Sequence, residues 1–343
     1  MKALIKQSPE PGALYVSDAP IPDIRPDEVL VKVHVAAICG TDMHIYHWTE
    51  YAQQRLKLPM VFGHEFAGEI VKAGDMVSNY KVGDRVAGET HIPCNRCYQC
   101  KTGNQHICEN MKIIGVQAAG AFAEYIPVPM DCLWKLDDSM DYETGALLEP
   151  MGVGVHGVLS GEIGGKTAVI LGCGPIGLFA VAAAKACGAS HVFAVDITDP
   201  KLALATDVGA DTVINSRKED AVGIVLKATG GLGADVVIDY TGNGAAVSSG
   251  FKMLRKGGRF TMVGLFDKPV SLDLTEDIVY KEARVNGSTG RLMYRTWFDC
   301  SRLLTSGKVD AKKIISGRYP LSEYKAAFAD IESGLPGKIL LFP

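Results

Sequence analysis

The cysteine-rich segment "CNRCYQCKTGNQHIC" has a spacing that metal sites use. Its cysteines follow the pattern C-x2-C-x2-C-x7-C. Thiolates this close together can surround one tetrahedral zinc ion, and a site made of four thiolates keeps no open position for a substrate. An iron–sulfur cluster is the alternative, because closely spaced cysteines hold both kinds of centre. The segment therefore predicts a structural metal site with four ligands: Cys94, Cys97, Cys100 and Cys108.

A second group of metal-binding side chains is spread over a longer stretch. Cys39, in "ICGTDMHIYHW", lies twenty-five residues before His64, and Glu65 follows His64 directly. The pair does not fit H-E-x-x-H, which argues against a metalloprotease helix. One thiolate, one imidazole and one carboxylate suit a zinc ion that keeps room for a water or a substrate oxygen. Each residue alone is more often structural, and Asp42 is expected only as a turn or capping acid.

The stretch "LGCGPIG" predicts a dinucleotide-binding loop. Gly172, Gly174 and Gly177 fit G-x-G-x-x-G between a strand pattern and a helix pattern, which is the context that the motif requires. Amides of such a loop and helix N-terminus bind a pyrophosphate. Asp196 ends the next strand pattern, where a carboxylate binds the ribose 2′-hydroxyl and repels a 2′-phosphate. NAD is therefore favoured over NADP, although Lys201 softens the preference. The alternative to a dinucleotide site is that these glycines form a purely structural turn in some other βαβ protein.

Two patterns of periodicity divide the chain. Up to about residue 150, short alternating strands such as "EVLVKVHVAA" and glycine-closed apolar runs are typical of an irregular β-rich domain. From about residue 165, apolar strands alternate with helices, beginning with "KTAVIL" and "PIGLFAVAAAKACG". This alternation predicts an α/β domain with a doubly wound parallel sheet. The last strand pattern, "GKILLF", is expected to return to the N-terminal domain.

Length, charge and cysteine usage limit the classes of function. The 343 residues are enough for two domains, and a net charge of -4 disfavours nucleic acid or an anionic membrane as the main partner. A small-molecule substrate is expected instead. The N-terminus lacks the apolar core of a secretory signal, and the cysteine cluster is typical of an intracellular metal protein, so we expect a cytoplasmic location. Residues 167–184 carry no charge, but their glycines and proline predict a strand, a turn and a helix rather than a membrane span.

Together these motifs resemble one known family. "ICGTDMH", "GHEFAGEI", "GDRVAG", the four-cysteine segment and "LGCGPIG" occur in the order and at the spacing of the zinc-dependent medium-chain alcohol dehydrogenases, over essentially the full chain. The resemblance implies a GroES-like catalytic domain at 1–152, a Rossmann NAD-binding domain at 153–292 and a return to the catalytic domain at 293–343. It also implies NAD, a homotetramer and two zinc ions per chain, one catalytic and one structural.

The same resemblance implies roles for individual residues. Cys39, His64 and Glu65 match the family's catalytic zinc ligands. The Thr41 hydroxyl would lie between the substrate oxygen and the cofactor ribose, and His44 would carry the proton onward to solvent. Glu149, in "LLEP", matches an acid that approaches the zinc in some members and assists ligand exchange or proton relay in others. Beyond the three glycines, the positions that match NAD contacts are Ile176, Asp196, Lys201, Val263, Gly264, Leu265, Ser288 and Thr289.

The expected substrate depends on the branch of the family. "LPMVFGHEFAGE", "GDRVAGETHIPC" and "GSTGRLMYRTW" are similar to the branch that oxidises L-threonine to 2-amino-3-oxobutanoate, in which a histidine matching His91 lies near the substrate. His91 also fits a plain loop position beside the cysteine segment. "EPMGVGVH" is similar instead to dehydrogenases of polyols and vicinal diols.

Two further hypotheses belong to other classes of protein. A non-catalytic zinc-ribbon module is disfavoured by the acidic charge and by the second metal set. A redox-inactive NAD-binding relative is disfavoured because the chain retains a complete set of candidate reactive side chains: Cys39, Thr41, His44, His64 and Glu65.

Overall fold

The computed structural model describes residues 1–343, which form two compact units. The first unit joins Met1–Glu149 to Ile315–Pro343, and the second is Pro150–Ile314. The segment expected to return to the first unit, 293–343, is therefore divided at Ile315. Its first part stays in the second unit, where Arg291 lies over the buried Trp297 ring at 5.8 Å. No helix of the chain is long and apolar enough to cross a membrane.

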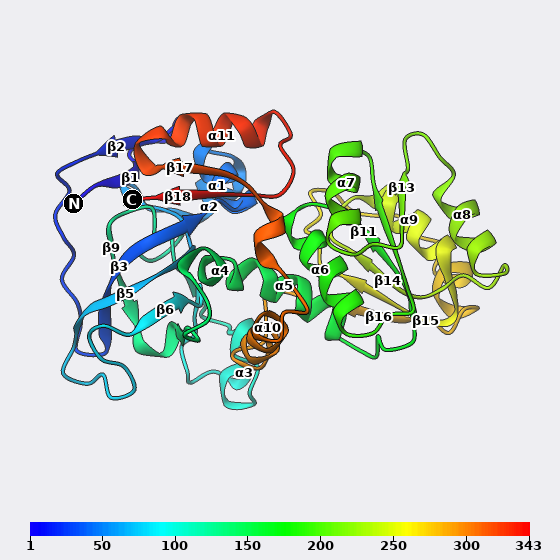
Figure 1. The fold of residues 1–343 in the computed structure, drawn as a ribbon, viewed down its shortest axis with the longest axis horizontal. Helices are drawn as coiled ribbons and strands as arrows, with labels where there is room; N and C mark the ends of the chain where they lie inside the picture. The colour runs from blue at the N-terminus through cyan, green and yellow to red at the C-terminus, as the bar shows by residue number, and fades with distance from the viewer. The chain divides into compact units, whose positions relative to one another are not determined.

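The first unit is built around a β-sheet that brings distant parts of the chain together. Strand β3 (Glu28–Ala37) pairs antiparallel with β5 (Glu65–Ala73), so that Ala37 lies opposite Glu65. The last strand, β18 (Lys338–Phe342), pairs antiparallel with the same end of β3 (Figure 1). The order of the sheet is β10-β6-β5-β3-β18-β17, with β9 also pairing β3. The segments around residues 38, 65 and 338 therefore converge.

The core of this unit is apolar and partly aromatic. The ring of Phe62 packs edge-on against Phe122 at 5.1 Å and against Phe328 at 6.3 Å, so residues from three parts of the chain share one cluster. The other elements are β1 (Ala3–Lys6), β2 (Leu14–Val16), α1 (Gly40–Tyr46), α2 (Glu50–Arg55), β4 (Met60–Val61), β6 (Arg85–Gly88), β7 (His91–Ile92), α3 (Tyr98–Lys101), β8 (Lys112–Ile113), β9 (Tyr125–Pro129), β10 (Leu133–Lys135), α4 (Tyr142–Ala146), β17 (Ile315–Pro320) and α11 (Tyr324–Glu332).

The second unit contains the predicted parallel sheet. Its six strands are all parallel in the order β13-β12-β11-β14-β15-β16. The chain runs outward in one direction from β11 and in the other from β14, and ligands of such sheets bind beyond the strand ends at this reversal. The elements are α5 (Leu148–Leu159), which begins at the boundary, β11 (Thr167–Leu171), α6 (Pro175–Ala186), β12 (His191–Asp196), α7 (Asp199–Asp207), β13 (Thr212–Asn215), α8 (Ala221–Ala228), β14 (Ala234–Asp239), α9 (Gly244–Met253), β15 (Leu254–Met262), β16 (Arg284–Gly287) and α10 (Arg295–Thr305).

Candidate dinucleotide and metal sites

The glycine loop after β11 has the shape of a phosphate cradle. Gly172 has a φ of +91°, a left-handed conformation that favours glycine. A Cβ on Gly177 would lie 1.8 Å from the Gly172 carbonyl oxygen, so only glycine allows α6 to pack this close. A Cβ on Gly174 would meet nothing, and the N-cap of α6 has no side-chain hydrogen bond. α6 begins with Pro175, which has no N–H, so the amides of Ile176 and Gly177 are the donors that its N-terminus offers to an anion.

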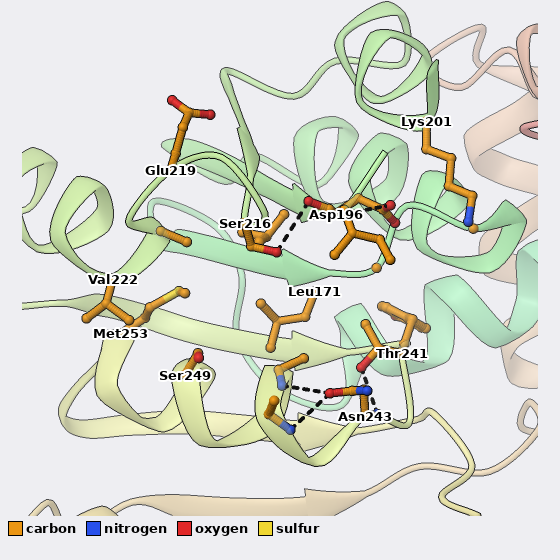
Figure 2. A pocket seen from close by; sticks show the side chains of 18 of the residues that line it. Leu171, Asp196, Lys201, Ser216, Glu219, Val222, Thr241, Asn243, Ser249 and Met253 are labelled. Atoms are coloured by element: carbon orange, nitrogen blue, oxygen red, sulfur yellow. Dashed lines mark hydrogen bonds between the residues drawn. The ribbon is translucent and has the colours of Figure 1, made fainter. Parts of the chain in front are cut away.

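A cavity of about 680 Å³ adjoins this loop within the second unit (Figure 2). Asp196 on its rim accepts hydrogen bonds at Oδ1 from the amides of Ile197 (2.7 Å) and Thr198 (3.1 Å). Its Oδ2 accepts one from the Cys173 amide at 2.8 Å, which ties the end of β12 to the glycine loop. The carboxylate is thus held in place, and Oδ2 keeps capacity to accept from a ribose hydroxyl. The expected cofactor residues that line the cavity are Gly172, Gly174, Asp196 and Lys201.

The other expected cofactor residues lie outside the lining of this cavity. Ser288 has a buried hydroxyl with no hydrogen-bond partner among the protein's own groups, which leaves it able to bond to a cofactor. A Cβ on Gly264 would lie 2.1 Å from the Gly242 amide nitrogen, so this position needs glycine for close packing, while Leu265 is 84% exposed. The remaining residues of this group are Ile176, Gly177, Val263 and Thr289.

Sequence reasoning missed several residues that line the cavity. Ser216 follows directly after β13, and Thr241 follows closely after β14. The available signal was their place beyond the carboxyl ends of parallel strands, where α/β sheets bind ligands. The apolar Val222 and Met253 lie away from Lys201 across the cavity (Figure 2), which suits a flat base at one end and a polar ribose at the other.

The mixed metal set comes together in the first unit. One ligand atom from each of Cys39, His64 and Glu65 lies within 4.8 Å of the others. The pairing of Ala37 with Glu65 explains this, because Cys39 lies two residues after the end of β3 and His64 directly precedes β5. Glu65 is fully buried and His64 is nearly so. A soft thiolate, an imidazole and a carboxylate at this separation match the donors of a catalytic zinc site.

Asp42 has a second role that the sequence reasoning did not foresee. As expected of a capping acid, its Oδ2 accepts a hydrogen bond from the Cys39 amide at 2.9 Å. Its Oδ1 lies 3.7 Å from His64 Nδ1, and both atoms are buried without another partner. Burial alone would lower the pKa of His64, but the negative charges of Asp42 and Cys39 raise it to about 10. With Nδ1 facing the carboxylate, Nε2 of His64 is the nitrogen left for a metal, which is the usual arrangement of ligating histidines.

Lys338, on the last strand, is paired with Glu65. Its ammonium donates to both carboxylate oxygens of Glu65, at 2.5 Å for Oε1, and to the carbonyl of Ile38 at 2.9 Å. Burial raises the pKa of Glu65, and the positive charge of Lys338 opposes this rise. The sequence offered no signal for this pair, because the two residues are 273 positions apart.

The expected proton-transfer residues occupy different environments. Thr41 is on the first turn of α1, and His44 is exposed, with Nδ1 3.1 Å from the Thr49 hydroxyl. Glu149 is buried, and its charge contributes to raising the pKa of His64, but it is not one of the three clustered donors. His91 is held by the buried Glu89, which accepts from its backbone amide at 2.9 Å and contacts its ring Nδ1 at 2.8 Å.

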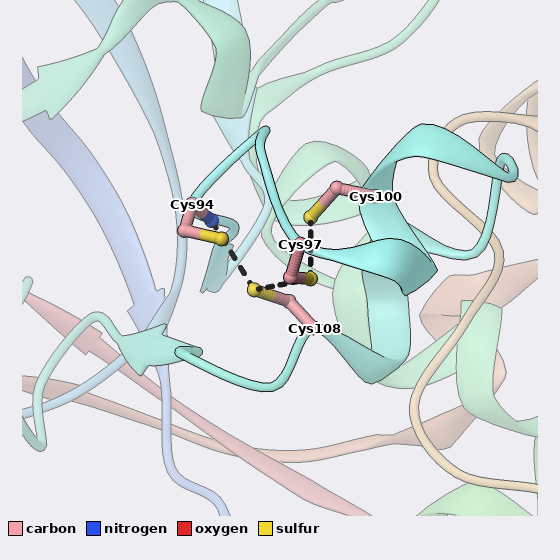
Figure 3. A group of neighbouring side chains, drawn as sticks. All are labelled: Cys94, Cys97, Cys100 and Cys108. Carbon is pink, nitrogen blue, oxygen red and sulfur yellow. Dashed lines mark hydrogen bonds between the residues drawn. The ribbon is translucent and has the colours of Figure 1, made fainter.

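The four cysteines form a compact cluster of sulfurs (Figure 3). The Cys97 sulfur lies 3.5 Å from that of Cys100 and 3.8 Å from that of Cys108. Sulfurs bound about 2.3 Å from one zinc ion lie about 3.8 Å apart, whereas an iron–sulfur cluster would hold them farther apart. Hydrogen bonds from the Arg96 and Cys97 amides lower the pKa of the Cys94 thiol to about 6. The donor set thus fits a single zinc ion.

Family models match both units. The model described as zinc-binding dehydrogenase matches residues 175–306, and the one described as alcohol dehydrogenase GroES-like domain matches residues 25–138. The curated relatives extend this match to the whole chain. An L-threonine 3-dehydrogenase of Bacillus velezensis is 46% identical over 344 residues, which cover 100% of this chain and 99% of the relative. The chain belongs to the zinc-dependent alcohol dehydrogenase family.

Other members of this family support the same assignment. L-threonine 3-dehydrogenase of Caldanaerobacter subterraneus is 46% identical, with 100% of this chain and 99% of the relative covered. Among solved structures, galactitol-1-phosphate dehydrogenase from Escherichia coli has a TM-score of 0.91 at 30% identity, covering 100% of both chains. The 2R,3R-butanediol dehydrogenase from Bacillus subtilis has a TM-score of 0.90 at 30% identity, covering 100% of this chain and 99% of the other. These matches confirm the predicted family and the predicted fold class. They also confirm the prediction of an oxidoreductase that uses zinc and a nicotinamide dinucleotide.

Proposed function

We propose that this enzyme oxidises the 3-hydroxyl of L-threonine, with NAD as hydride acceptor and 2-amino-3-oxobutanoate as product. The observation that carries the proposal is full-length identity of 42–46% to curated L-threonine 3-dehydrogenases. The buried cluster of Cys39, His64 and Glu65 supports it, because oxidation of a secondary alcohol needs a group that acidifies the hydroxyl.

We further propose two zinc ions per chain and a preference for NAD over NADP. Cys39, His64 and Glu65 would hold one zinc, and the four-cysteine cluster the other. When bound at the first site, zinc supplies the Lewis acidity that brings the pKa of an alcohol toward neutrality. Asp196 supports the preference for NAD, since its fixed carboxylate would repel a 2′-phosphate.

The side chains of the first unit provide the rest of the chemistry. The Thr41 hydroxyl accepts the proton of the substrate alcohol as it releases its own, and the exposed His44 passes the released proton to solvent. The Asp42 carboxylate faces Nδ1 of His64 and stabilises a proton there, and Lys338 balances the charge of Glu65. Glu149, buried nearby, is proposed to assist the exchange of proton or ligand. Gly172, Gly174 and Asp196 would hold NAD, which would supply the hydride acceptor for the carbinol carbon.

A vicinal diol or a polyol is the second candidate substrate. The segment "EPMGVGVH" favours it, as do the solved 2R,3R-butanediol and galactitol-1-phosphate dehydrogenases among the structural neighbours. The decisive assay follows NADH formation with L-threonine, sorbitol and 2,3-butanediol under one set of conditions. The highest kcat/KM with L-threonine, together with formation of 2-amino-3-oxobutanoate, supports the first proposal. A higher value with either of the others replaces it.

Removal of Cys39 tests the metal mechanism. Cys39→Ser should lose the zinc of the mixed set and nearly all turnover, because a hydroxyl is a poor zinc ligand, while circular dichroism shows a retained fold. Cys187→Ser, a substitution of a partly exposed cysteine outside both clusters, is the matched control. Full turnover in a Cys39→Ser enzyme shown to lack this zinc would contradict the mechanism.

We also propose, from the family resemblance, a homotetramer that works in the cytoplasm on a small-molecule substrate. Light scattering of the purified enzyme tests the assembly: a molar mass near four chains supports it, and a monomer rejects it.

A further inference from the structure

His156, on helix α5, is hydrogen-bonded to the loop that follows the last strand of the parallel sheet. Its ring Nδ1 lies 3.1 Å from the carbonyl oxygen of Gly290, although the two residues are 134 positions apart. A carbonyl oxygen only accepts, so Nδ1 is the donor and carries a proton. Burial lowers the pKa of His156, so the ring is neutral near neutral pH and Nδ1 holds its single proton.

The same face of α5 packs against the next residue of this loop. Gly152 lies four residues before His156, about one turn of the helix away. A Cβ on Gly152 would lie 2.7 Å from Cδ of Arg291, so the glycine lets the Arg291 side chain pass close to the helix. α5 therefore holds Gly290 by a hydrogen bond and Arg291 by close packing.

The loop contains two residues that would contact the cofactor. Ser288 and Thr289 directly precede Gly290, and the buried hydroxyl of Ser288 has no hydrogen-bond partner among the protein's own groups. The Ser288 amide donates to the carbonyl of Met262 at 2.9 Å, which fixes the start of the loop to the end of β15. His156 fixes the loop two residues further on. The backbone that carries Ser288 and Thr289 is thus held from both sides.

The topology of the sheet indicates which half of NAD this loop would hold. A doubly wound sheet consists of two halves, each of which binds one half of a dinucleotide beyond its strand ends. Asp196 and Ser216 lie at the ends of β12 and β13, in the half expected to take the adenine ribose. Ser288 follows β16, the outermost strand of the other half. Residues 288–291 therefore belong to the half that would take the nicotinamide end.

We propose that His156 is a positioning residue, whose Nδ1–H holds residues 288–291 in the conformation that binds the nicotinamide end of NAD. The proposal rests on the proposed function in one respect, namely that NAD is the cofactor, and it does not depend on which alcohol is oxidised. Loss of this donor should weaken the binding of NAD. It should leave unchanged the binding of ADP-ribose, which lacks the nicotinamide.

The test compares the Kd values of NAD and ADP-ribose for the purified, zinc-loaded enzyme by isothermal titration calorimetry. His156→Leu removes the donor and should raise the Kd of NAD about threefold to tenfold, the effect of losing one hydrogen bond, without changing that of ADP-ribose. His156→Asn should bind NAD within about twofold of the wild type, because its amide nitrogen replaces Nδ1 as the donor. His156→Gln places its amide one bond farther out and should bind NAD as weakly as His156→Leu.

His191→Leu is the matched control. The ring Nε2 of His191 also makes a hydrogen bond, 2.9 Å from the Thr212 hydroxyl, but at the amino end of β12, whereas cofactors bind beyond the carboxyl ends of the strands. Both Kd values should equal those of the wild type in this variant.

Three results would overturn the role of His156. They are an unchanged Kd of NAD in His156→Leu and His156→Gln, an equal weakening of NAD and ADP-ribose, and a His156→Asn enzyme that binds NAD as weakly as His156→Leu. Should His156→Leu fail to fold, the comparison of His156→Gln with His156→Asn decides the question. A wild-type enzyme that prefers NADP rejects only the proposed cofactor preference, and the same comparison is then made with NADP.

Discussion

Asp42 shows how one buried carboxylate serves two neighbours. It accepts from the Cys39 amide through Oδ2 and faces His64 Nδ1 through Oδ1. A full negative charge in a fully buried position needs such partners, because burial raises the pKa of Asp42 and disfavours its ionised form. Its position links the cap of α1 to the orientation of a proposed zinc ligand.

At this residue we predict that Asp42→Asn weakens zinc binding about tenfold to a hundredfold, the usual cost of losing a carboxylate behind a ligating histidine. The asparagine oxygen can still cap α1, so the fold should persist. Competition with a chromogenic chelator measures the affinity, and Asp18→Asn, at an exposed acid of the same unit, is the control. Zinc retention equal to that of the wild type would show that Asp42 acts only as a cap.

At the scale of elements, the β3–β5–β18 arrangement carries the mixed metal set. Cys39 lies just after β3, Glu65 is the first residue of β5, and Lys338 is the first residue of β18, near the far end of the chain. Lys338 is almost completely buried and its ammonium contacts the carboxylate directly. Removal of one partner from a buried ion pair leaves an uncompensated charge in a low dielectric.

We therefore predict that Lys338→Met lowers the free energy of unfolding by about 3–5 kcal/mol. Urea unfolding after removal of zinc with a chelator measures the change, because a bound zinc ion would itself compensate the Glu65 carboxylate. Lys325→Met, at an exposed lysine on α11, should leave the unfolding free energy nearly unchanged. A small effect of Lys338→Met in the zinc-free enzyme would contradict the prediction, and would mean that Glu65 takes up a proton when Lys338 is lost.

The cysteine loop is a second element whose fold depends on a ligand. Its only helices are the short α3 and the three-residue 3₁₀ helix Gln105–Ile107, so the sulfur cluster is its main cross-link. We predict that Cys100→Ser loses one zinc ion per chain and lowers the thermal midpoint, because metal binding here contributes folding free energy. Elemental analysis and calorimetry check both effects. An unchanged zinc content would exclude this cluster as a zinc site.

At the scale of the whole molecule, cofactor binding should raise the stability of the enzyme against thermal unfolding. A ligand that binds only the folded state at a hundredfold excess over its Kd adds about 2.7 kcal/mol. We predict that NAD raises the thermal midpoint of the enzyme, and that NADP at the same concentration raises it less because of Asp196. Differential scanning calorimetry compares the two cofactors. Equal shifts would reject the proposed preference for NAD.

Local motifs were enough to predict the family and two of the candidate sites, namely the glycine loop and the four-cysteine cluster. The glycine loop needs only a backbone conformation within six residues, and the cysteine cluster needs only a fifteen-residue loop, so both sites are specified by neighbours in the sequence. Alternating strands and helices likewise determined the parallel sheet, since each apolar strand must be covered on both faces.

Only the tertiary structure determined the contacts between residues that are far apart in the sequence. Asp42 lies against His64 because β3 and β5 pair antiparallel, and Lys338 reaches Glu65 because β18 joins the same sheet. Asp42 and Lys338 are ordinary residues by type and local pattern, and they gain chemical roles only from the neighbours that the register of the sheet gives them.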